Sequence, residues 1–167
     1  MEFKFNKENI NPIEFAFKNQ VDLPFFKANK GEIMPADGKI YLGLGEEDKF
    51  NKEILKEAIC KLGKFLNEKD VESVSIIDNT TKLYDKDFVL AIAEAIIVSQ
   101  YDFNHYKSEK KENLFKNLNF SDKFAEFEDE LKELENVLEG QFLARNLVNL
   151  RSNDIYPESL AQAAVDN

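Results

Sequence analysis

The sequence has almost no cysteine, since Cys60 is the only one among 167 residues. A single cysteine excludes an intramolecular disulfide and any metal site built mainly from cysteine thiolates. A reducing compartment fits this composition best.

Positive charge is also scarce, because 22 Lys and Arg stand against 32 Asp and Glu, giving a formal net charge of -10. Only two of the basic residues are arginines, Arg145 and Arg151. A nucleic-acid binder concentrates Lys and Arg where they meet phosphates, so this balance disfavours nucleic acid as a partner.

Long hydrophobic runs are missing as well. No stretch approaches the roughly 20 apolar residues that span a bilayer, and the amino-terminal segment MEFKFNKENINPIEFAF lacks the features of a signal peptide. We expect a cytoplasmic protein that does not enter a membrane. Hydrophobic residues nevertheless make up 43% of the chain and include 15 Phe, which is enough apolar material for a folded domain.

Short strands are expected at the beginning of the chain. Residues 2–26 alternate irregularly between apolar and polar residues, with turns near Asn11-Pro12 and Asn19. The apolar positions of these strands are Phe3, Phe5, Ile13, Phe15, Phe17, Val21, Leu23 and Phe25. After turn signals at 29–31 and 36–38, the segment KIYLGL at 39–44 predicts a further strand.

Helices alternate with strands beyond residue 38. Asn51 is a good cap for a helix whose apolar residues continue to Leu66, and Asp85 caps a second, almost wholly apolar helix at 88–101. The segments VESVSIID at 71–78 and LFKNLNF at 114–120 predict strands. This alternation predicts an α/β fold in which a mixed sheet is sandwiched by helices.

A long helix is predicted after Ser121, which is a suitable cap. Its apolar residues at 3-4 spacing are Phe124, Phe127, Leu131, Leu134 and Leu138. Gly140 interrupts this pattern and indicates a bend or close packing, because glycine inside a helix costs about 1 kcal/mol relative to alanine. Pro157 then begins a final helix, PESLAQAAVD, in which the chain stops.

Gly43-Leu44-Gly45 lies between a predicted strand and a predicted helix, the context in which dinucleotide-binding folds cradle a phosphate. The third glycine of that motif is missing, and three acidic residues, Glu46, Glu47 and Asp48, stand where a phosphate would approach. We therefore interpret the segment as a structural turn.

No catalytic, cofactor-binding or metal-binding residue is predicted in this chain. His105 lies between aromatic residues without partners for catalysis and is assigned a packing or surface role, and Cys60 is assigned as a buried thiol. The acidic pair Glu46-Glu47 and the acidic residues within 126–130 fit no calcium loop, and the stretch 107–112 is interpreted as a solvated turn.

The segment 139–166, EGQFLARNLVNLRSNDIYPESLAQAAVD, resembles the domain junction of leucyl aminopeptidases (cytosol aminopeptidases). There, a helix ending in an L-A-R-D-L-V-N type sequence leads through a turn to a P-x-x-L-A helix. The matching residues are Leu143, Ala144, Arg145, Leu147, Val148, Asn149, Asn153, Pro157, Leu160 and Ala161. GLGEEDKFNKEILKEA at 43–58 and YDFNHYKSEKKE at 101–112 also resemble parts of the amino-terminal domain. Asn146 replaces an acidic residue of the pattern, and Leu150-Arg151-Ser152 replaces a turn that contains proline.

The resemblance implies three parts. Residues 1–120 are an α/β amino-terminal domain similar to macro domains, 121–150 a long linker helix, and 151–167 the truncated start of a catalytic domain. In the family, that catalytic domain holds two divalent metal ions, zinc or manganese, and releases the first residue of a peptide. The ligand motif N-T-D-A-E-G is absent here.

We therefore expect a non-catalytic domain, inactive alone, whose partner is its own catalytic domain in a homohexameric parent enzyme. Two alternatives remain. One is a macro-like module that binds a nucleotide or ADP-ribose, motivated by Gly43-Leu44-Gly45. The other is a DNA-binding accessory domain, as in some bacterial members of the family.

Overall fold

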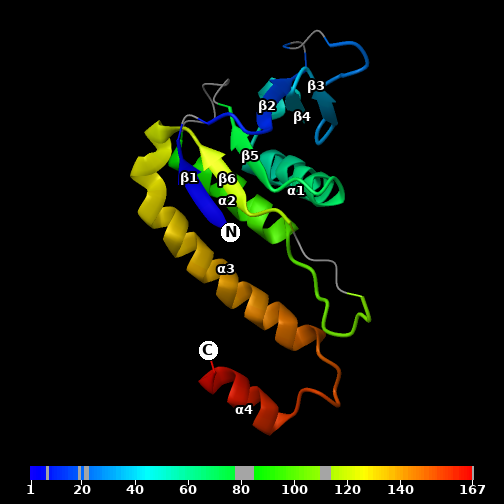
Figure 1. The fold of residues 1–167 in the computed structure, drawn as a ribbon, viewed down its shortest axis with the longest axis vertical. Coiled ribbons are helices and arrows are strands. Elements are labelled where there is room, and N and C mark those ends of the chain that lie inside the picture. The colour runs from blue at the N-terminus through cyan, green and yellow to red at the C-terminus, as the bar shows by residue number, and fades with distance from the viewer. Residues whose placement is uncertain (7, 19, 21–22, 78–84, 110–113, 167) are drawn as a thin grey trace.

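The computed structural model describes residues 1–6, 8–18, 20, 23–77, 85–109 and 114–166, which form one six-stranded sheet and four α-helices (Figure 1). The strands are β1 (Glu2–Phe5), β2 (Pro12–Phe17), β3 (Ile33–Ala36), β4 (Lys39–Gly45), β5 (Ser73–Ile76) and β6 (Asn117–Phe120). The helices are α1 (Lys52–Glu68), α2 (Lys86–Ser99), α3 (Glu128–Asn149) and α4 (Pro157–Val165), with 3-10 turns η1 (Glu47–Lys49) and η3 (Asp122–Phe127). The predicted α/β class is confirmed.

The sheet has the order β1-β6-β5-β2-β4-β3, and all neighbours are parallel except β3 and β4. The mixed sheet is therefore also confirmed. Strand β3 was not expected from the sequence, because Pro35 and two flanking turns make 33–36 a poor strand segment. Its place at the edge explains why proline is tolerated there.

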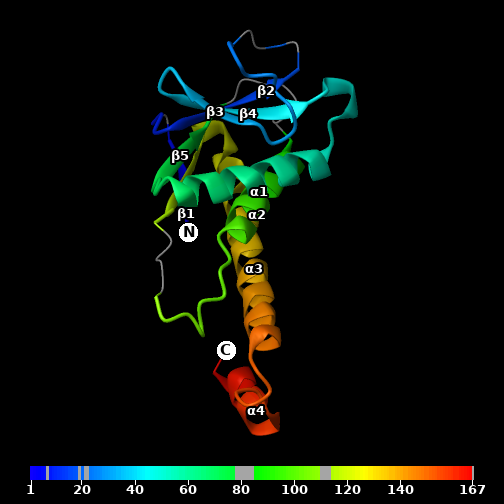
Figure 2. The same ribbon diagram turned by 90° about the vertical axis from the view of Figure 1, so that its right-hand side faces the viewer.

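One face of the sheet is apolar. The register places Phe3 beside Leu118 and Leu118 beside Val74, and further along Ile13 lies between Ile76 and Ile40. Helices α1 and α2 cross each other over this face (Figure 2), and α3 packs beside α2. Burial of this continuous apolar cluster is the main stabilising term of the fold.

The two predicted helix caps are present. The Asn51 side chain accepts a hydrogen bond from the backbone N–H of Ile54 at 3.0 Å, and the Asp85 side chain accepts one from Asp87 N–H at 3.2 Å. Each cap satisfies one N–H group that the first turn of a helix leaves without a partner.

The opposite face of β5 and β6 is polar. Ser73 and Ser75 lie beside Asn117 and Asn119, and the connection between β1 and β2 runs across them, because Ser75 Oγ donates to the carbonyl of Glu8 at 2.8 Å. In the described part of the chain no helix covers this face. The expectation that helices sandwich the sheet is therefore wrong: the helices lie on the apolar side only.

On β2 and β4 the same opposite face carries a small second core. Ala16 and Tyr41 are buried there together with Phe26 and Ala28. The segment 23–28 thus covers this face of β2 and β4, where no helix packs in the described residues. The predicted strand around Leu23 and Phe25 is wrong: Leu23 and Phe26 form an isolated bridge, and Phe25 between them is 97% exposed. Val21 lies outside the described residues.

The long helix begins later in the chain than predicted. Ser121 precedes η3 and makes no capping hydrogen bond, and regular α-helix begins only at Glu128. Helix α3 continues through Gly140, and a Cβ atom added there would meet no atom within 4 Å. Close packing is therefore not the reason for that glycine. Pro157 begins α4 as predicted, and the helix ends at Val165.

Candidate functional site

The segment Gly43-Leu44-Gly45 at the end of β4 is hydrogen-bonded to the backbone of residues 28–32. The N–H of Gly43 donates to the carbonyl of Glu32 at 2.8 Å, and that of Gly45 donates to the carbonyl of Ala28 at 2.9 Å. A Cβ atom on Gly43 would lie 2.2 Å from the carbonyl oxygen of Asn29. This glycine permits two backbone segments to touch, so neither of the two N–H groups is free for a phosphate.

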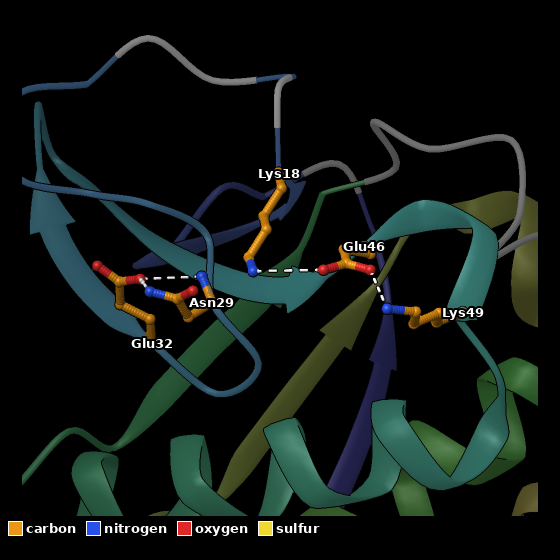
Figure 3. Close-up of polar contacts among 5 residues, drawn as sticks. All are labelled: Lys18, Asn29, Glu32, Glu46 and Lys49. Atoms are coloured by element: carbon orange, nitrogen blue, oxygen red, sulfur yellow. Dashed lines mark hydrogen bonds and ion pairs between the residues drawn. The ribbon is translucent and has the colours of Figure 1, made fainter.

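The first acidic residue after this segment is already paired with lysines. Glu46 follows Gly45 and pairs with Lys49 and with Lys18, whose Nζ is 3.7 Å from Oε1. Figure 3 shows the Glu46 carboxylate between these two ammonium groups. The hydrogen bond and charge of Lys49, and then Lys18, lower the pKa of Glu46, so the carboxylate stays ionised at neutral pH. Gly43, Leu44 and Gly45 are the last three residues of strand β4 and do not form a separate turn.

Glu32, a further acidic residue near this segment, accepts hydrogen bonds from backbone N–H groups. Burial raises the pKa of Glu32, but hydrogen bonds from the backbone N–H groups of Asn29 and Lys27 outweigh it and leave the pKa below its usual value. The carboxylate accepts these bonds at 2.9 and 3.1 Å. The Glu32 carboxylate therefore fixes the backbone of its own loop, residues 27–32.

His105 and Cys60, the two single residues considered in the sequence, both contact neighbouring residues. His105 is exposed and packs between Phe103 and Tyr106, with ring centroids 6.0 and 4.7 Å away. Cys60 is half-buried, its thiol faces the carbonyl of Ala95 at 3.6 Å, and burial raises its pKa. Cys60 is therefore less buried than expected, and a raised pKa favours its thiol form.

Two of the acidic residues within 126–130 are paired with lysines. Glu130 accepts a bond from Lys86 at 2.7 Å, and Glu128 pairs with Lys132 at 2.8 Å on the same helix. Within the described ranges no group of three or more His, Cys, Asp or Glu could hold a metal ion. The stretch 107–112 lies partly outside those ranges.

An aromatic cluster joins the loop after α2 to the end of α3. The Tyr106 hydroxyl donates to Asp154 and accepts from the backbone N–H of Arg151 at 2.8 Å, while the Arg151 guanidinium lies 4.2 Å from the Tyr106 ring centre. Arg145 likewise lies over the ring of Tyr101, at 5.3 Å. Both arginines of the chain are therefore used in this cluster, which sequence reasoning did not find.

A pocket of about 300 Å³ lies at the carboxyl ends of β1, β5 and β6. Its wall includes Asn6 and Glu8 from the connection after β1, and Ser75 and Asn119 from the polar face. Asn119 is only 1% exposed, and its Oδ1 atom accepts no hydrogen bond. In open α/β sheets, ligands bind outside the carboxyl ends of the strands, which is where this pocket lies.

The local sequence contains only a weak signal for this pocket. Asn117 and Asn119 alternate with apolar residues in NLNF, which is typical of a strand with one solvated face. Only the fold shows that the connection after β1 covers that face and encloses the asparagine.

Helices α3 and α4 end in an arm that extends from the body of the domain (Figure 1). The apolar residues exposed on it are Val148, Tyr156, Leu160 and Val165, at 84%, 53%, 49% and 79%. No residue of α4 is buried. We call these four residues the arm patch.

The chain is similar to known aminopeptidases. Residues 34–110 match the family model of the N-terminal domain of the cytosol aminopeptidase family. A probable cytosol aminopeptidase of Treponema denticola is 32% identical over 130 residues, covering 75% of this chain and 27% of the relative. That of Clostridium tetani is 30% identical over 170 residues, covering 95% and 35%. The chain thus spans about a third of the length of these relatives.

Solved structures share the fold at low identity. A mutant of tomato leucine aminopeptidase superposes with a TM-score of 0.76 at 16% identity, over 98% of this chain and 41% of that one. The bottromycin maturation enzyme BotP gives a TM-score of 0.73 at 17% identity, over 95% of this chain and 37% of that one.

Among the described residues, no helix is both long and apolar enough to cross a membrane. The match to the family model and the relatives that align along nearly the whole chain place this protein in the cytosol aminopeptidase family, as its N-terminal domain.

Proposed function

We propose that this chain is the non-catalytic N-terminal domain of a metal-dependent leucyl aminopeptidase, and that the parent enzyme releases amino-terminal residues from peptides. The observation that carries the proposal is the match of this chain to the first third of cytosol aminopeptidases. In this division, residues 1–120 are the α/β domain, 121–150 the linker helix and 151–167 the start of the catalytic domain. We place the α/β domain close to macro domains and the parent in the cytoplasm.

The two metal ions belong outside this chain in the proposal. One structure of BotP contains manganese, and zinc or manganese is the metal we propose for the parent. The described residues of this chain do not offer a suitable set of ligands. We therefore assign this chain no step of peptide hydrolysis.

The arm patch supports a role in docking. Val148 and Val165 are largely exposed apolar side chains at the end that leads toward the rest of the relatives' sequence. Exposed apolar side chains on one arm are candidates for burial against another domain. The occupant we propose is the chain's own catalytic domain, within a homohexameric parent.

The first test is the activity of the isolated chain. The purified protein is incubated with leucine p-nitroanilide and manganese or zinc, and release of p-nitroaniline is followed. We expect no turnover above that of the metal alone. Turnover that survives repeated purification would overturn the non-catalytic assignment.

The second test is a chimera in which this chain replaces the matching third of the Clostridium tetani relative. We expect the chimera to fold and cleave the substrate. Val148→Asp together with Leu160→Asp should lower activity and assembly, whereas Glu133→Gln, on the exposed side of α3, serves as a matched control. Equal activity of all three proteins would refute docking through the arm patch.

A further inference from the structure

We propose that the hydroxyl of Tyr106 is the point at which the body of the domain fixes the direction of α4. Tyr101 and Tyr106 form what we call the tyrosine clasp. Through them one loop, residues 101–107, binds both the end of α3 and the connection from α3 to α4, residues 151–156. The clasp determines how the domain presents its arm, which the proposed function leaves open.

The arm beyond Phe142 lies outside the apolar cores. Phe142 is the last described residue that packs against either of the two cores. No residue of α4 is buried, and this helix lies away from the body of the domain in both views (Figures 1 and 2). Packing against the core therefore does not determine where α4 points, and polar and aromatic contacts take that role.

The connection and the start of α4 form one unit. The carbonyl of Arg151 accepts a hydrogen bond from Asp154 N–H at 2.8 Å, and Tyr156 N–H donates to Ser159 Oγ at 2.9 Å. Leu150, which lies between α3 and this unit, has the extended backbone angles φ -68° and ψ 146°. Rotation about Leu150 would therefore redirect α4 as a whole.

Two hydrogen bonds join this unit to the body, and both end on the Tyr106 hydroxyl. It donates to the Asp154 carboxylate and accepts from Arg151 N–H at 2.8 Å. The Arg151 guanidinium also covers the Tyr106 ring, 4.2 Å from its centre. Within the described ranges, no other hydrogen bond or ion pair connects residues 151–156 to the body. A single hydroxyl group therefore carries the hydrogen bonding between the two parts.

The rest of the loop fixes the position of Tyr106. Its ring packs against His105 and Phe103, with ring centroids 4.7 and 5.7 Å away. Lys107 closes the loop through an ion pair with Asp102 at 2.8 Å. Because neighbouring side chains restrict the ring, its hydroxyl has a defined place from which to orient α4.

The clasp has a consequence for the parent enzyme. If α4 begins the catalytic domain, Tyr106 sets the angle between the two domains. This consequence rests on the proposed function, whereas the hold on α4 does not. The isolated chain tests the hold alone, so a failure of the clasp and a failure of the proposed function are distinguishable.

Spin labels measure the direction of α4 in the full chain. With Cys60→Ala as background, one label is attached at Glu53→Cys on α1 and the other at Ala161→Cys on α4, both at exposed positions. Pulsed double electron resonance gives the distribution of distances between them. We expect one narrow distribution in the background chain. In Tyr106→Phe a second distance should appear, because losing two hydrogen bonds raises the population of the released arm about tenfold.

The controls separate positioning from general stability. Tyr101→Phe is the matched variant, because it removes a hydroxyl of the same loop that also makes two hydrogen bonds, but to α3. It should lower stability and leave the distance between Glu53→Cys and Ala161→Cys in one narrow distribution. A second label pair, Glu53→Cys with Asn136→Cys on α3, should report no change in either variant.

Asp154 supplies a test that leaves both tyrosines in place. Asp154→Asn keeps an oxygen that accepts from the Tyr106 hydroxyl, so the distribution should stay narrow. Asp154→Ala removes the acceptor and should broaden it. This pair of variants decides the question even if Tyr106→Phe fails to fold, which circular dichroism would reveal.

Four results would overturn the proposal. The distribution stays narrow in Tyr106→Phe, or it broadens equally in Tyr101→Phe, which would assign the effect to the stability of the loop. It is already broad in the background chain, so that α4 is not held. Finally, it is the same in Asp154→Ala and Asp154→Asn, so that the bond to the hydroxyl does not matter.

Discussion

The hydroxyl of Tyr101 donates a hydrogen bond to Oδ1 of Asn146 at 3.0 Å and thereby fastens the loop after α2 to the last turns of α3. Asn149, one turn further, donates to the same hydroxyl at 3.1 Å. Asn146 stands where the family pattern has an acidic residue. Both residue types offer an oxygen that accepts from tyrosine, so this departure from the pattern preserves the contact.

Tyr101→Phe should loosen this contact. The ring remains beside Phe142, with centroids 5.2 Å apart in the unchanged protein, but two hydrogen bonds are lost. We expect the free energy of unfolding to fall by about 1 kcal/mol, because net contributions of single hydrogen bonds are of that order. Urea denaturation followed by circular dichroism measures the change.

A double-mutant cycle supplies the control for this prediction. Asn146→Ala alone should destabilise to a similar degree, and the combined variant should lose less than the sum of the two. Strict additivity would mean that the hydroxyl and the amide do not interact in solution.

Gly43→Ala should destabilise the fold strongly. The added Cβ would lie 2.2 Å from Asn29 O and 2.6 Å from the carbonyl carbon of Ala28, and both are backbone atoms that cannot rotate away. A loss of about 3 kcal/mol is expected from overpacking at such a site. Thermal unfolding measures it.

Gly38→Ala separates the steric effect from the conformational one. Gly38 has a φ of 75°, but a methyl group added there would meet nothing within 4 Å. Only the left-handed conformation is then penalised, by about 1–2 kcal/mol. A loss as large as that of Gly43→Ala would contradict the importance of the close approach.

Gly140→Ala should stabilise the protein. The position is exposed in the middle of α3, and the new methyl group meets open space. Alanine has the higher helix propensity, by about 1 kcal/mol. If chemical denaturation instead reveals a loss, α3 needs glycine for a bend, as the sequence pattern suggested.

The contribution of Tyr106 should depend on pH. Burial and the hydrogen bond to Asp154 raise its pKa above the ordinary value, because both disfavour the phenolate. A group with a raised folded-state pKa stabilises fully below its unfolded pKa, which is about 10, and loses that contribution as pH rises through the folded value.

The measurement compares the unchanged chain with Tyr106→Phe in urea between pH 7 and pH 11. The stability difference should be constant up to about pH 9 and shrink above it. Absorbance of tyrosinate should show one titrating tyrosine fewer in the variant. A difference that grows with pH would mean that the phenolate is favoured in the fold.

Local signals identified the elements with their own caps. Asn51 and Asp85 define where α1 and α2 begin, since each cap bonds to a backbone group only two or three residues away. Such contacts depend only on neighbouring residues, so the sequence predicts them. The segment Gly43-Leu44-Gly45 was expected to be a turn but ends strand β4, because its N–H groups bond to the backbone of residues 28–32.

Long-range contacts account for what the sequence missed. Strand β3 exists because Met34 and Ile33 pair with β4 across a tight turn, despite Pro35. The buried state of Asn119 depends on a connection more than a hundred positions earlier in the chain, and no local periodicity encodes that. The start of α3 was misplaced because Ser121 has the residue type of a cap while the chain there forms η3.

The pairing of β1 with β6 has a consequence for how this protein comes into being. Glu2 leaves the ribosome long before Asn117, its partner in the sheet. Strand β1 therefore cannot pair until β6 has been synthesised. Closing so long a loop is entropically slow, and the β2–β4 region can assemble before it. During synthesis, strand β1 is therefore the piece most in need of protection from other nascent chains.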